Sequence, residues 1–268
     1  MARGSSDIPV DLKYELYEGS VQCHESDIEF INEQFKKFRG REAKVLREDF
    51  GGTGALACDW TKQGSDFQAY AVDLDVEPIS YGQKTHYQTL NDEEKERMKY
   101  IEGNVLDNFS FKADVLVAFN FSYFIFKKRQ LLKDYFQKAY EGLKDDGVFM
   151  VDIFGGTECF QECVEETEHD DHSYYWDCDN YNPLTNEVLY YIHFKTHKDK
   201  KKYNKVFTYD WRHWSVREIT ELMEEVGFSK VVTYWEGEDE DGDGDGNFFE
   251  STVEENCESW VIYIAGLK

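Results

Sequence analysis

The segment that decides the fold is VLREDFGGTGALA, residues 45–57. It places a glycine-rich turn between an apolar strand candidate and a helix candidate. Glycines in such a turn permit positive φ and let a ligand approach the backbone closely. As a motif, Gly52 to Ala57 fits the GxGxxA form of the dinucleotide fingerprint, and Asp73 follows about 20 residues later, where a ribose diol is bound. A turn that merely closes a strand–helix unit is the alternative interpretation.

Strand and helix patterns alternate regularly around this turn. Short apolar runs predict strands at 44–48, 68–74, 98–103, 113–119 and 147–153, and helical periodicity predicts helices at 55–63, 76–88 and 131–143. Asp75 is expected to cap the second of these helices. Repeated βα units imply a parallel sheet with helices on both faces, and ligands of such sheets bind at the carboxyl ends of the strands.

Two further regions flank this block. An amphipathic helix is predicted over 26–39, capped by Ser26 or Asp27, and the segment before it could fold over the top of the sheet. After the block, strand patterns at 173–180, 187–197 and 203–211 indicate an antiparallel insertion. A helix over 215–226, capped by Ser215 and ended by Gly227, leads to two last strands at 230–235 and 259–265.

These patterns together predict an α/β fold. We expect a seven-stranded, mostly parallel sheet with helices on both faces, an antiparallel last strand and a small antiparallel β insertion. The expected parts are an N-terminal helical cap at 1–43, a core formed by 44–156 and 215–268, and a lid insertion at 157–214. The insertion is too short to bury a core of its own.

The acids ahead of the glycines distinguish between possible ligands. A dinucleotide places a pyrophosphate at this turn, where Glu48 and Asp49 would repel it. S-adenosylmethionine has no phosphate, and its ammonium and sulfonium groups are both cationic. A carboxylate at the end of the first strand therefore favours S-adenosylmethionine over NAD.

At these residues the chain resembles the class I S-adenosylmethionine-dependent methyltransferases, over most of 44–154 and the final pair of strands. The first motif of that family, an apolar pair, an acid and then GxGxG, aligns with Val45-Leu46, Glu48 and the run from Phe50 to Gly54. Phe50 stands where the family has its first glycine. The resemblance implies a Rossmann-like fold, S-adenosylmethionine as cofactor and methyltransferase activity, in place of an NAD-dependent dehydrogenase.

The later motifs of that family imply further cofactor contacts. Asp73, followed by Leu74, matches the acid that accepts both ribose hydroxyls. Asn104 matches the acceptor for the adenine amino group, with Asp107 as the competing candidate, and the Val105 N–H can serve the neighbouring ring nitrogen. The segment at Asn120 would pass beneath the methionine part. The implied cofactor-binding residues are Glu48, Phe50, Gly51, Gly52, Gly54, Asp73, Leu74, Asn104, Val105 and Asn120.

The acceptor side of the site is less defined. Methyl transfer from a sulfonium needs approach geometry, and it needs a general base only when the acceptor must first lose a proton, so no catalytic residue is named. The acceptor is expected to be an unidentified small molecule held between the N-terminal segment and the lid. The candidate substrate-binding residues are Tyr17, Tyr123, Trp211, Arg212 and His213. Core packing is the alternative role for the tryptophan.

Two other functions stay open at this point. The chain could be a binding or regulatory module that keeps the cofactor pocket without turnover. It could also be a protein methyltransferase that acts on a basic peptide.

The charge of the chain limits its partners. Among 268 residues there are 30 basic and 55 acidic side chains, which give a net charge of −25 and argue against nucleic-acid binding. Acids concentrate in 158–179 and 236–258, which contain no Lys or Arg, so we expect an acidic rim that attracts cationic ligands. No apolar stretch reaches the length of a membrane span, and the N-terminus lacks a secretory signal. A cytoplasmic protein with reduced cysteines is expected.

Two acidic motifs raise the question of a metal. The stretch His169-Asp170-Asp171-His172 could bind a cation, but a solvated loop is the favoured interpretation. Residues 239–250 fit the letters of an EF-hand calcium loop, yet strands rather than helices are predicted around them. A solvated loop between strands is favoured, with weak cation binding as the alternative, and no metal site is assigned.

Overall fold

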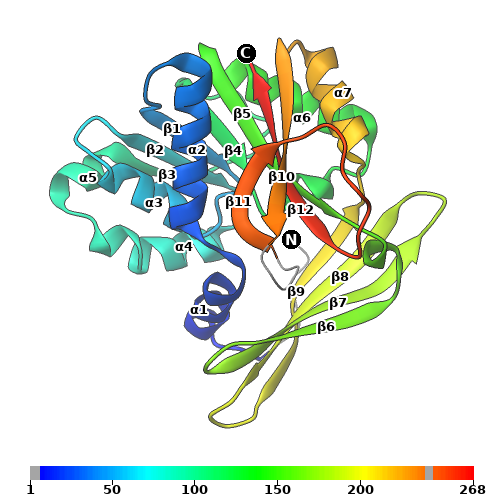
Figure 1. Ribbon diagram of the computed structural model, residues 1–268. Coiled ribbons are helices and arrows are strands. Elements are labelled where there is room, and N and C mark those ends of the chain that lie inside the picture. Colours follow the sequence, from blue (N-terminus) through cyan, green and yellow to red (C-terminus); the bar gives the residue numbers. More distant parts are fainter. Residues whose placement is uncertain (1–6, 239–243) are drawn as a thin grey trace.

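The computed structural model describes residues 7–238 and 244–268, and its framework is one large sheet (Figure 1). The strand order is β11-β10-β12-β5-β4-β1-β2-β3. Strands β3, β2, β1, β4 and β5 run parallel to one another, whereas β12 is antiparallel to β5 and to β10. The bounds are β1 Val45–Asp49, β2 Gln68–Asp73, β3 Met98–Glu102, β4 Ala113–Ala118, β5 Leu143–Gly155, β10 Lys230–Glu238, β11 Gly244–Glu250 and β12 Trp260–Leu267. The predicted fold class is confirmed.

The sheet has eight strands and not the predicted seven. The additional strand, β11, covers residues 244–250 of the EF-hand-like run, for which a loop was predicted; residues 239–243 of that run, like residues 1–6, lie outside the described residues. Backbone pairing with the outer edge of β10 and packing of Phe248 against Phe30 and Tyr263 hold β11 in place. Most of its side chains are exposed, so no apolar alternation marks it as a strand.

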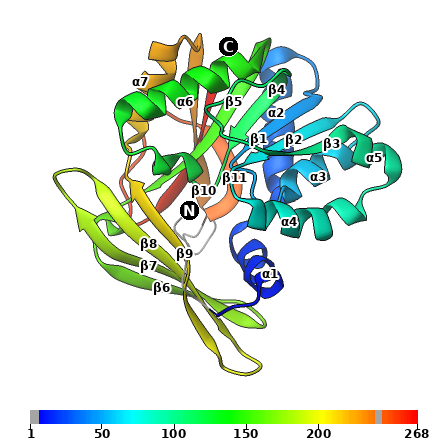
Figure 2. The same cartoon turned by 180° about the vertical axis from the view of Figure 1, so that it is seen from behind.

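Helices cover both faces of this sheet (Figures 1 and 2). One cluster of buried residues joins α2 and α3 to the sheet, and another joins α6 and α7 to its opposite face. All six residues of β4 are buried, as expected for a strand covered on both sides. The helices are α1 Val10–Val21, α2 His24–Arg39, α3 Ala55–Lys62, α4 Val76–Lys84, α5 Asp92–Arg97, α6 Arg129–Gly142 and α7 Val216–Val226, with short 3₁₀ turns η1 Tyr87–Thr89, η2 Ser122–Ile125 and η3 Glu158–Phe160.

Two of the predicted N-terminal helix caps are confirmed, and a third is wrong. The Asp75 side chain accepts from Glu77 N, and Ser215 forms a capping box with Glu218 before α7, as predicted. The cap predicted at Ser26 or Asp27 is wrong, because α2 begins at His24. Asp27 instead accepts a hydrogen bond of 2.6 Å from the Tyr263 hydroxyl and so joins α2 to β12.

A second, four-stranded antiparallel sheet lies at one end of the molecule, together with α1 (Figures 1 and 2). Its strands are β6 Cys163–Glu168, β7 His172–Asn182, β8 Glu187–Thr196 and β9 Lys202–Arg212. Tyr14 of α1 packs against Tyr81 of α4 and Phe207 of β9, which places α1 between the core and this sheet. Across the described ranges 7–238 and 244–268, no helix is long and apolar enough to cross a membrane.

Candidate functional site

The strand order creates a crevice at the carboxyl ends of β1 and β4. From β1 the chain proceeds outward through β2 to β3, and then returns to place β4 on the other side of β1. Loops that follow two such neighbouring strands diverge in opposite directions, and ligands of open α/β sheets bind in the gap. The glycine turn follows β1, and Asn120 follows β4, so both predicted segments meet at this crevice.

Three adjoining cavities occupy the crevice. The turn cavity, of about 60 Å³, lies beside Glu48, Gly51, Gly52 and Asn120. The edge cavity, of about 340 Å³, is lined by Asp73, Leu74, Asn104 and Val105, among others. The aromatic cavity, of about 150 Å³, is lined by Tyr17, Asn120, Phe121, Tyr174, Trp176, Tyr209 and Trp211, among others. Tyr209 of β9 lines all three, so they meet at this residue.

The glycine turn is held by hydrogen bonds to its own backbone and to β2. Gly51 N donates to Val72 O at 3.0 Å, and Gly54 N donates to Gly51 O at 2.7 Å. Gly52 and Gly54 have φ of 53° and 66°, which glycine adopts without a steric cost. Phe50, at the position of the family's first glycine, also has a positive φ of 57°, and its ring packs against Tyr135. This packing offsets the cost of a bulky residue there.

Glu48 and Asp49 differ in their surroundings, although they are adjacent in sequence. Asp49 is buried and pairs with the buried guanidinium of Arg47, at 2.6 Å from Oδ1 to Nε. Glu48 accepts one hydrogen bond, of 3.3 Å from Ala57 N, and no ion pair to it occurs within residues 7–238 and 244–268. Loss of hydration, with nearby Asp27 and Asp73, raises the pKa of Glu48 to about 8. Asp49 therefore has a cation that compensates its charge, whereas Glu48 has none in the described chain and is ionised at neutral pH only when a cation binds beside it.

Asp73 connects the glycine turn to the edge cavity. Its Oδ2 accepts from Gly52 N at 2.9 Å, and its Oδ1 accepts from Asp75 N at 2.8 Å. These two bonds fix the carboxylate in the cavity wall, where burial raises its pKa. Farther along the wall, the Asn104 amide oxygen accepts from Leu106 N at 3.0 Å, and Asn104 N donates to Asp107. Asn104 and Val105 line the edge cavity, whereas Asp107 is not among its lining residues.

The structure separates the predicted acceptor-side residues into two groups. Tyr17 and Trp211 line the aromatic cavity. Tyr123, Arg212 and His213 line none of the three cavities. Successive residues of β9 point to opposite faces, so Trp211 faces the site and Arg212 does not.

The three excluded side chains have structural partners instead. The Tyr123 side chain is fully buried, and its hydroxyl donates to Asp152 O at 2.8 Å. Arg212 stacks on Trp214 and pairs with Glu218 at 2.9 Å. His213 forms a 2.7 Å hydrogen bond with the Tyr190 hydroxyl, and burial lowers its pKa to about 4.

One other predicted residue, Gly54, also lines none of the cavities. It is the residue before α3, and its Cα faces Tyr100 so closely that a Cβ would lie 2.6 Å from the ring. Its contribution is to the path of the turn.

Sequence reasoning missed several residues of the site. Tyr209 could have been found from the alternation of Phe207, Tyr209 and Trp211 along β9. Tyr174 and Trp176 show the same alternation on β7. Asp152, which accepts hydrogen bonds from Asn120 N and Phe121 N, gave no such signal, because it lies in the apolar run that forms β5.

The chain was compared with protein-family models, with known sequences and with solved structures. No protein-family model matches the chain. A Geobacillus sp. (strain WCH70) protein named "Putative methyltransferase GWCH70_2453" is 23% identical over 209 residues, which cover 75% of this chain and 80% of that protein.

Solved structures of methyltransferases resemble this chain over most of its length. An S-adenosylmethionine-dependent methyltransferase from Clostridium acetobutylicum ATCC 824 has a TM-score of 0.68 at 18% identity, with 94% of this chain and 96% of that chain covered. DesVI from Streptomyces venezuelae has a TM-score of 0.68 at 17% identity, with 96% and 98% covered. CalS10, an amino pentose methyltransferase from Micromonospora echinaspora, has a TM-score of 0.67 at 9% identity, with 96% and 97% covered. The chain therefore has the fold of S-adenosylmethionine-dependent methyltransferases.

Proposed function

We propose that this chain, which has the methyltransferase fold, transfers a methyl group from S-adenosylmethionine to an amine of a small-molecule acceptor. The observation that carries the proposal is the Glu48 carboxylate, which borders the turn cavity with no cation beside it in the described chain. A cationic ligand in that cavity would compensate this charge. The ammonium of S-adenosylmethionine supplies such a cation, whereas the pyrophosphate of NAD would add to the repulsion.

The other groups around the crevice fit the rest of that cofactor. Asp73 has one hydrogen bond to each carboxylate oxygen and retains acceptor capacity toward the edge cavity, where ribose hydroxyls would donate to it. The Asn104–Val105 stretch, together with apolar Leu106 and Leu131, provides a wall for the adenine. When bound, the cofactor supplies a methyl group activated by the sulfonium. Asn120 and Tyr209 line both the cofactor side and the aromatic cavity, so we place the acceptor in the aromatic cavity.

The lining of the aromatic cavity favours an amine over an alcohol. Among the described residues that line it there is no acid, histidine or lysine, so no side chain is suited to remove a proton from a hydroxyl group. The phenols do not fill this role, because burial raises the pKa of Tyr17 to about 12 and raises those of Tyr174 and Tyr209 as well. An uncharged amine attacks without a base. The aromatic faces then favour the ammonium that forms.

The size and surroundings of the cavity support a small acceptor. Its volume of about 150 Å³ is below the range of roughly 300–1,000 Å³ typical of pockets for drug-sized ligands. The acidic stretch 158–179 covers η3, β6 and part of β7, where it would attract an amine in its protonated form. The amine would release its proton to solvent before its uncharged nitrogen attacks. These features favour a small cationic molecule over a peptide or a nucleic acid.

Helix α1 closes the turn cavity from outside. Glu18 of α1 accepts from the Thr53 hydroxyl at 2.5 Å and lies 2.7 Å from His86 Nε2. Tyr14 and Tyr17 of the same helix line the cavity. By excluding water, α1 would strengthen the interaction between Glu48 and a bound cation.

The domain division and the location in the cell are part of the same proposal. We assign 1–43 to a cap, 44–156 and 215–268 to the catalytic core, and 157–214 to a lid. All six cysteines are free thiols, which is consistent with a cytoplasmic protein.

Titration calorimetry followed by a turnover assay tests the proposed function. We expect S-adenosylmethionine and S-adenosylhomocysteine to bind at one site per chain, and NAD not to bind. Turnover is then measured with amine and alcohol pairs of the same shape, such as cyclohexylamine and cyclohexanol, by release of S-adenosylhomocysteine. Release with amines alone is expected. Binding of NAD in place of S-adenosylmethionine, or release with alcohols only, would overturn the proposal.

A further inference from the structure

We propose that Asp152 is a positioning residue, which holds Asn120 and Phe121 at the boundary between the turn cavity and the aromatic cavity. Its Oδ2 accepts from Asn120 N at 2.6 Å, and its Oδ1 accepts from Phe121 N at 2.9 Å. Its expected effect on methyl transfer rests on the proposed function, whereas its effect on the backbone of this segment does not.

The backbone at this segment is unusual and requires support. Asn120 and Phe121 both have φ of 56°, so two successive residues other than glycine adopt the left-handed conformation. That conformation costs about 1–2 kcal/mol for an ordinary L-residue, and asparagine tolerates it better than phenylalanine. In this segment the two successive N–H groups both donate to one carboxylate. The Asp152 carboxylate occupies that point, so its two hydrogen bonds offset the strain.

The charge of Asp152 has no ion-pair partner within residues 7–238 and 244–268. The side chain is 7% exposed, and the titratable groups that face it are acidic or phenolic: Asp27 of α2, Tyr17 of α1, Tyr123 of η2 and Tyr263 of β12. Burial raises the pKa of Asp152 to about 8. Burial of an unpaired carboxylate reduces stability, and the hydrogen bonds from these two N–H groups compensate part of that cost.

The residues that Asp152 holds lie where cofactor and acceptor would meet. Asn120 lines both the turn cavity and the aromatic cavity. Phe121 lines the aromatic cavity, and its ring packs 4.5 Å from that of Phe154. Reacting atoms must approach to about 3–3.5 Å, and a misplacement of about 1 Å can reduce a rate about 100-fold. Rotation of these two peptides would therefore slow the transfer step more than it weakens cofactor binding.

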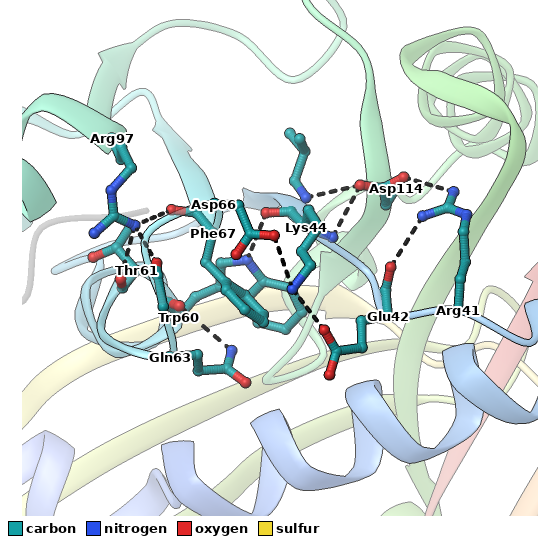
Figure 3. A network of polar contacts seen from close by, with 12 residues as sticks. Arg41, Glu42, Lys44, Trp60, Thr61, Gln63, Asp66, Phe67, Arg97 and Asp114 are labelled. Carbon is teal, nitrogen blue, oxygen red and sulfur yellow. Dashed lines mark hydrogen bonds and ion pairs between the residues drawn. The ribbon is translucent and has the colours of Figure 1, made fainter.

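Asp114 provides a matched control, because it makes the same kind of contact at the other end of the sheet. It is 1% exposed, and its Oδ2 accepts from two successive N–H groups, Lys44 N at 3.0 Å and Val45 N at 2.9 Å. Figure 3 shows it beside Lys44 and Arg41, and the Arg41 guanidinium forms an ion pair with it at 2.8 Å. None of these residues lines the three cavities. Asp114→Asn removes the charge of a buried carboxylate away from the site, together with its ion pairs to Arg41 and Lys144, while the remaining oxygen can still accept from both N–H groups.

The kinetic test compares Asp152→Asn with Asp114→Asn. Each variant keeps the size of the side chain but loses one of its two acceptor oxygens. With saturating S-adenosylmethionine, we expect kcat of Asp152→Asn to fall by about 100-fold, with its KM for the cofactor within about threefold of the wild type. We expect kcat of Asp114→Asn to stay within about twofold, although its melting temperature falls. Equal kcat values for the two folded variants would overturn the role of Asp152.

A second measurement is independent of turnover. Hydrogen exchange at the amides of residues 120 and 121 is followed in both variants by NMR. We expect faster exchange at these two amides in Asp152→Asn alone, with the amide of Gly51 still protected. Unchanged exchange would overturn the proposal. If the wild-type protein methylates no acceptor, the proposed function fails, and the exchange result still decides the role of Asp152.

Discussion

The variant Glu48→Gln tests whether the Glu48 carboxylate binds the cofactor or stabilises the fold. The amide keeps the size of the side chain and can still accept from Ala57 N, so only the charge is removed. A hydrogen bond to a charged group contributes about 1.5–3 kcal/mol, and its loss should weaken S-adenosylmethionine binding by roughly 10- to 100-fold. The wild-type residue must also lose a proton before it can receive an ammonium group.

The pH dependence of both binding and stability follows from this carboxyl. Because the pKa of Glu48 is raised to about 8 in the free protein, affinity for S-adenosylmethionine should rise by up to about tenfold per pH unit between pH 6 and 7.5. Stability of the free protein changes in the opposite direction. The folded-state pKa lies above the unfolded value, so the contribution of Glu48 is full below about pH 4.5 and is lost as pH rises through about 8.

The assay combines titration calorimetry with chemical denaturation, and Asp49→Asn is the matched control. We expect Glu48→Gln to bind the cofactor weakly, to lose the pH dependence of binding, and to be at least as stable as the wild type at pH 8. Asp49→Asn should instead lower the free energy of unfolding by about 3–5 kcal/mol, because it leaves the charge of the buried Arg47 guanidinium without a compensating carboxylate. Unchanged affinity and pH dependence in Glu48→Gln would refute the reasoning.

Three further predictions concern the walls around the site. Trp176→Ala should raise KM for an amine acceptor several-fold and leave cofactor affinity unchanged, since among the three cavities Trp176 lines only the aromatic one. A loss of cofactor binding measured by calorimetry would contradict this assignment of Trp176 to the acceptor side. Gly82→Ala should lower the free energy of unfolding by about 1–3 kcal/mol and weaken cofactor binding, because the alanine Cβ would lie 1.8 Å from Thr53 O in the glycine turn. A variant as stable as the wild type in denaturant would contradict that packing. Ser215→Ala should cost about 1 kcal/mol through loss of the α7 capping box, with kcat unchanged, and a change in kcat would show that α7 affects the site.

The buried framework could be predicted from sequence because burial leaves a regular pattern. β4 was evident as a run of apolar residues, and α7 as a periodic helix between a capping serine and a glycine. Exposed elements left no such pattern. β6 and β11 are edge strands with mostly exposed side chains, and α5 buries no residue, although its capping box from Asn91 to Glu94 was a usable signal.

The candidate site could be predicted only where a local motif encodes it. The glycine turn and Asp73 are joined by one hydrogen bond at 2.9 Å, and both belong to a recognisable βα unit. The acceptor side depends on tertiary contacts between α1, the small sheet and the loop after β4. The burial of the Tyr123 ring in η2 cannot be predicted from its sequence context near Asn120. Asp152 could not be identified from the sequence, because no local pattern marks a carboxylate on β5 that accepts hydrogen bonds from the loop after β4.

The most direct test of the central claim is transfer of an isotopically labelled methyl group from S-adenosylmethionine to a pool of small amines, measured by mass spectrometry together with S-adenosylhomocysteine release. We expect a labelled amine and one S-adenosylhomocysteine for each methyl group transferred, with both lost in Glu48→Gln at limiting cofactor concentration. Tight cofactor binding without any labelled product from amines, alcohols or basic peptides would contradict it, and would identify the chain as a module that binds the cofactor without turnover.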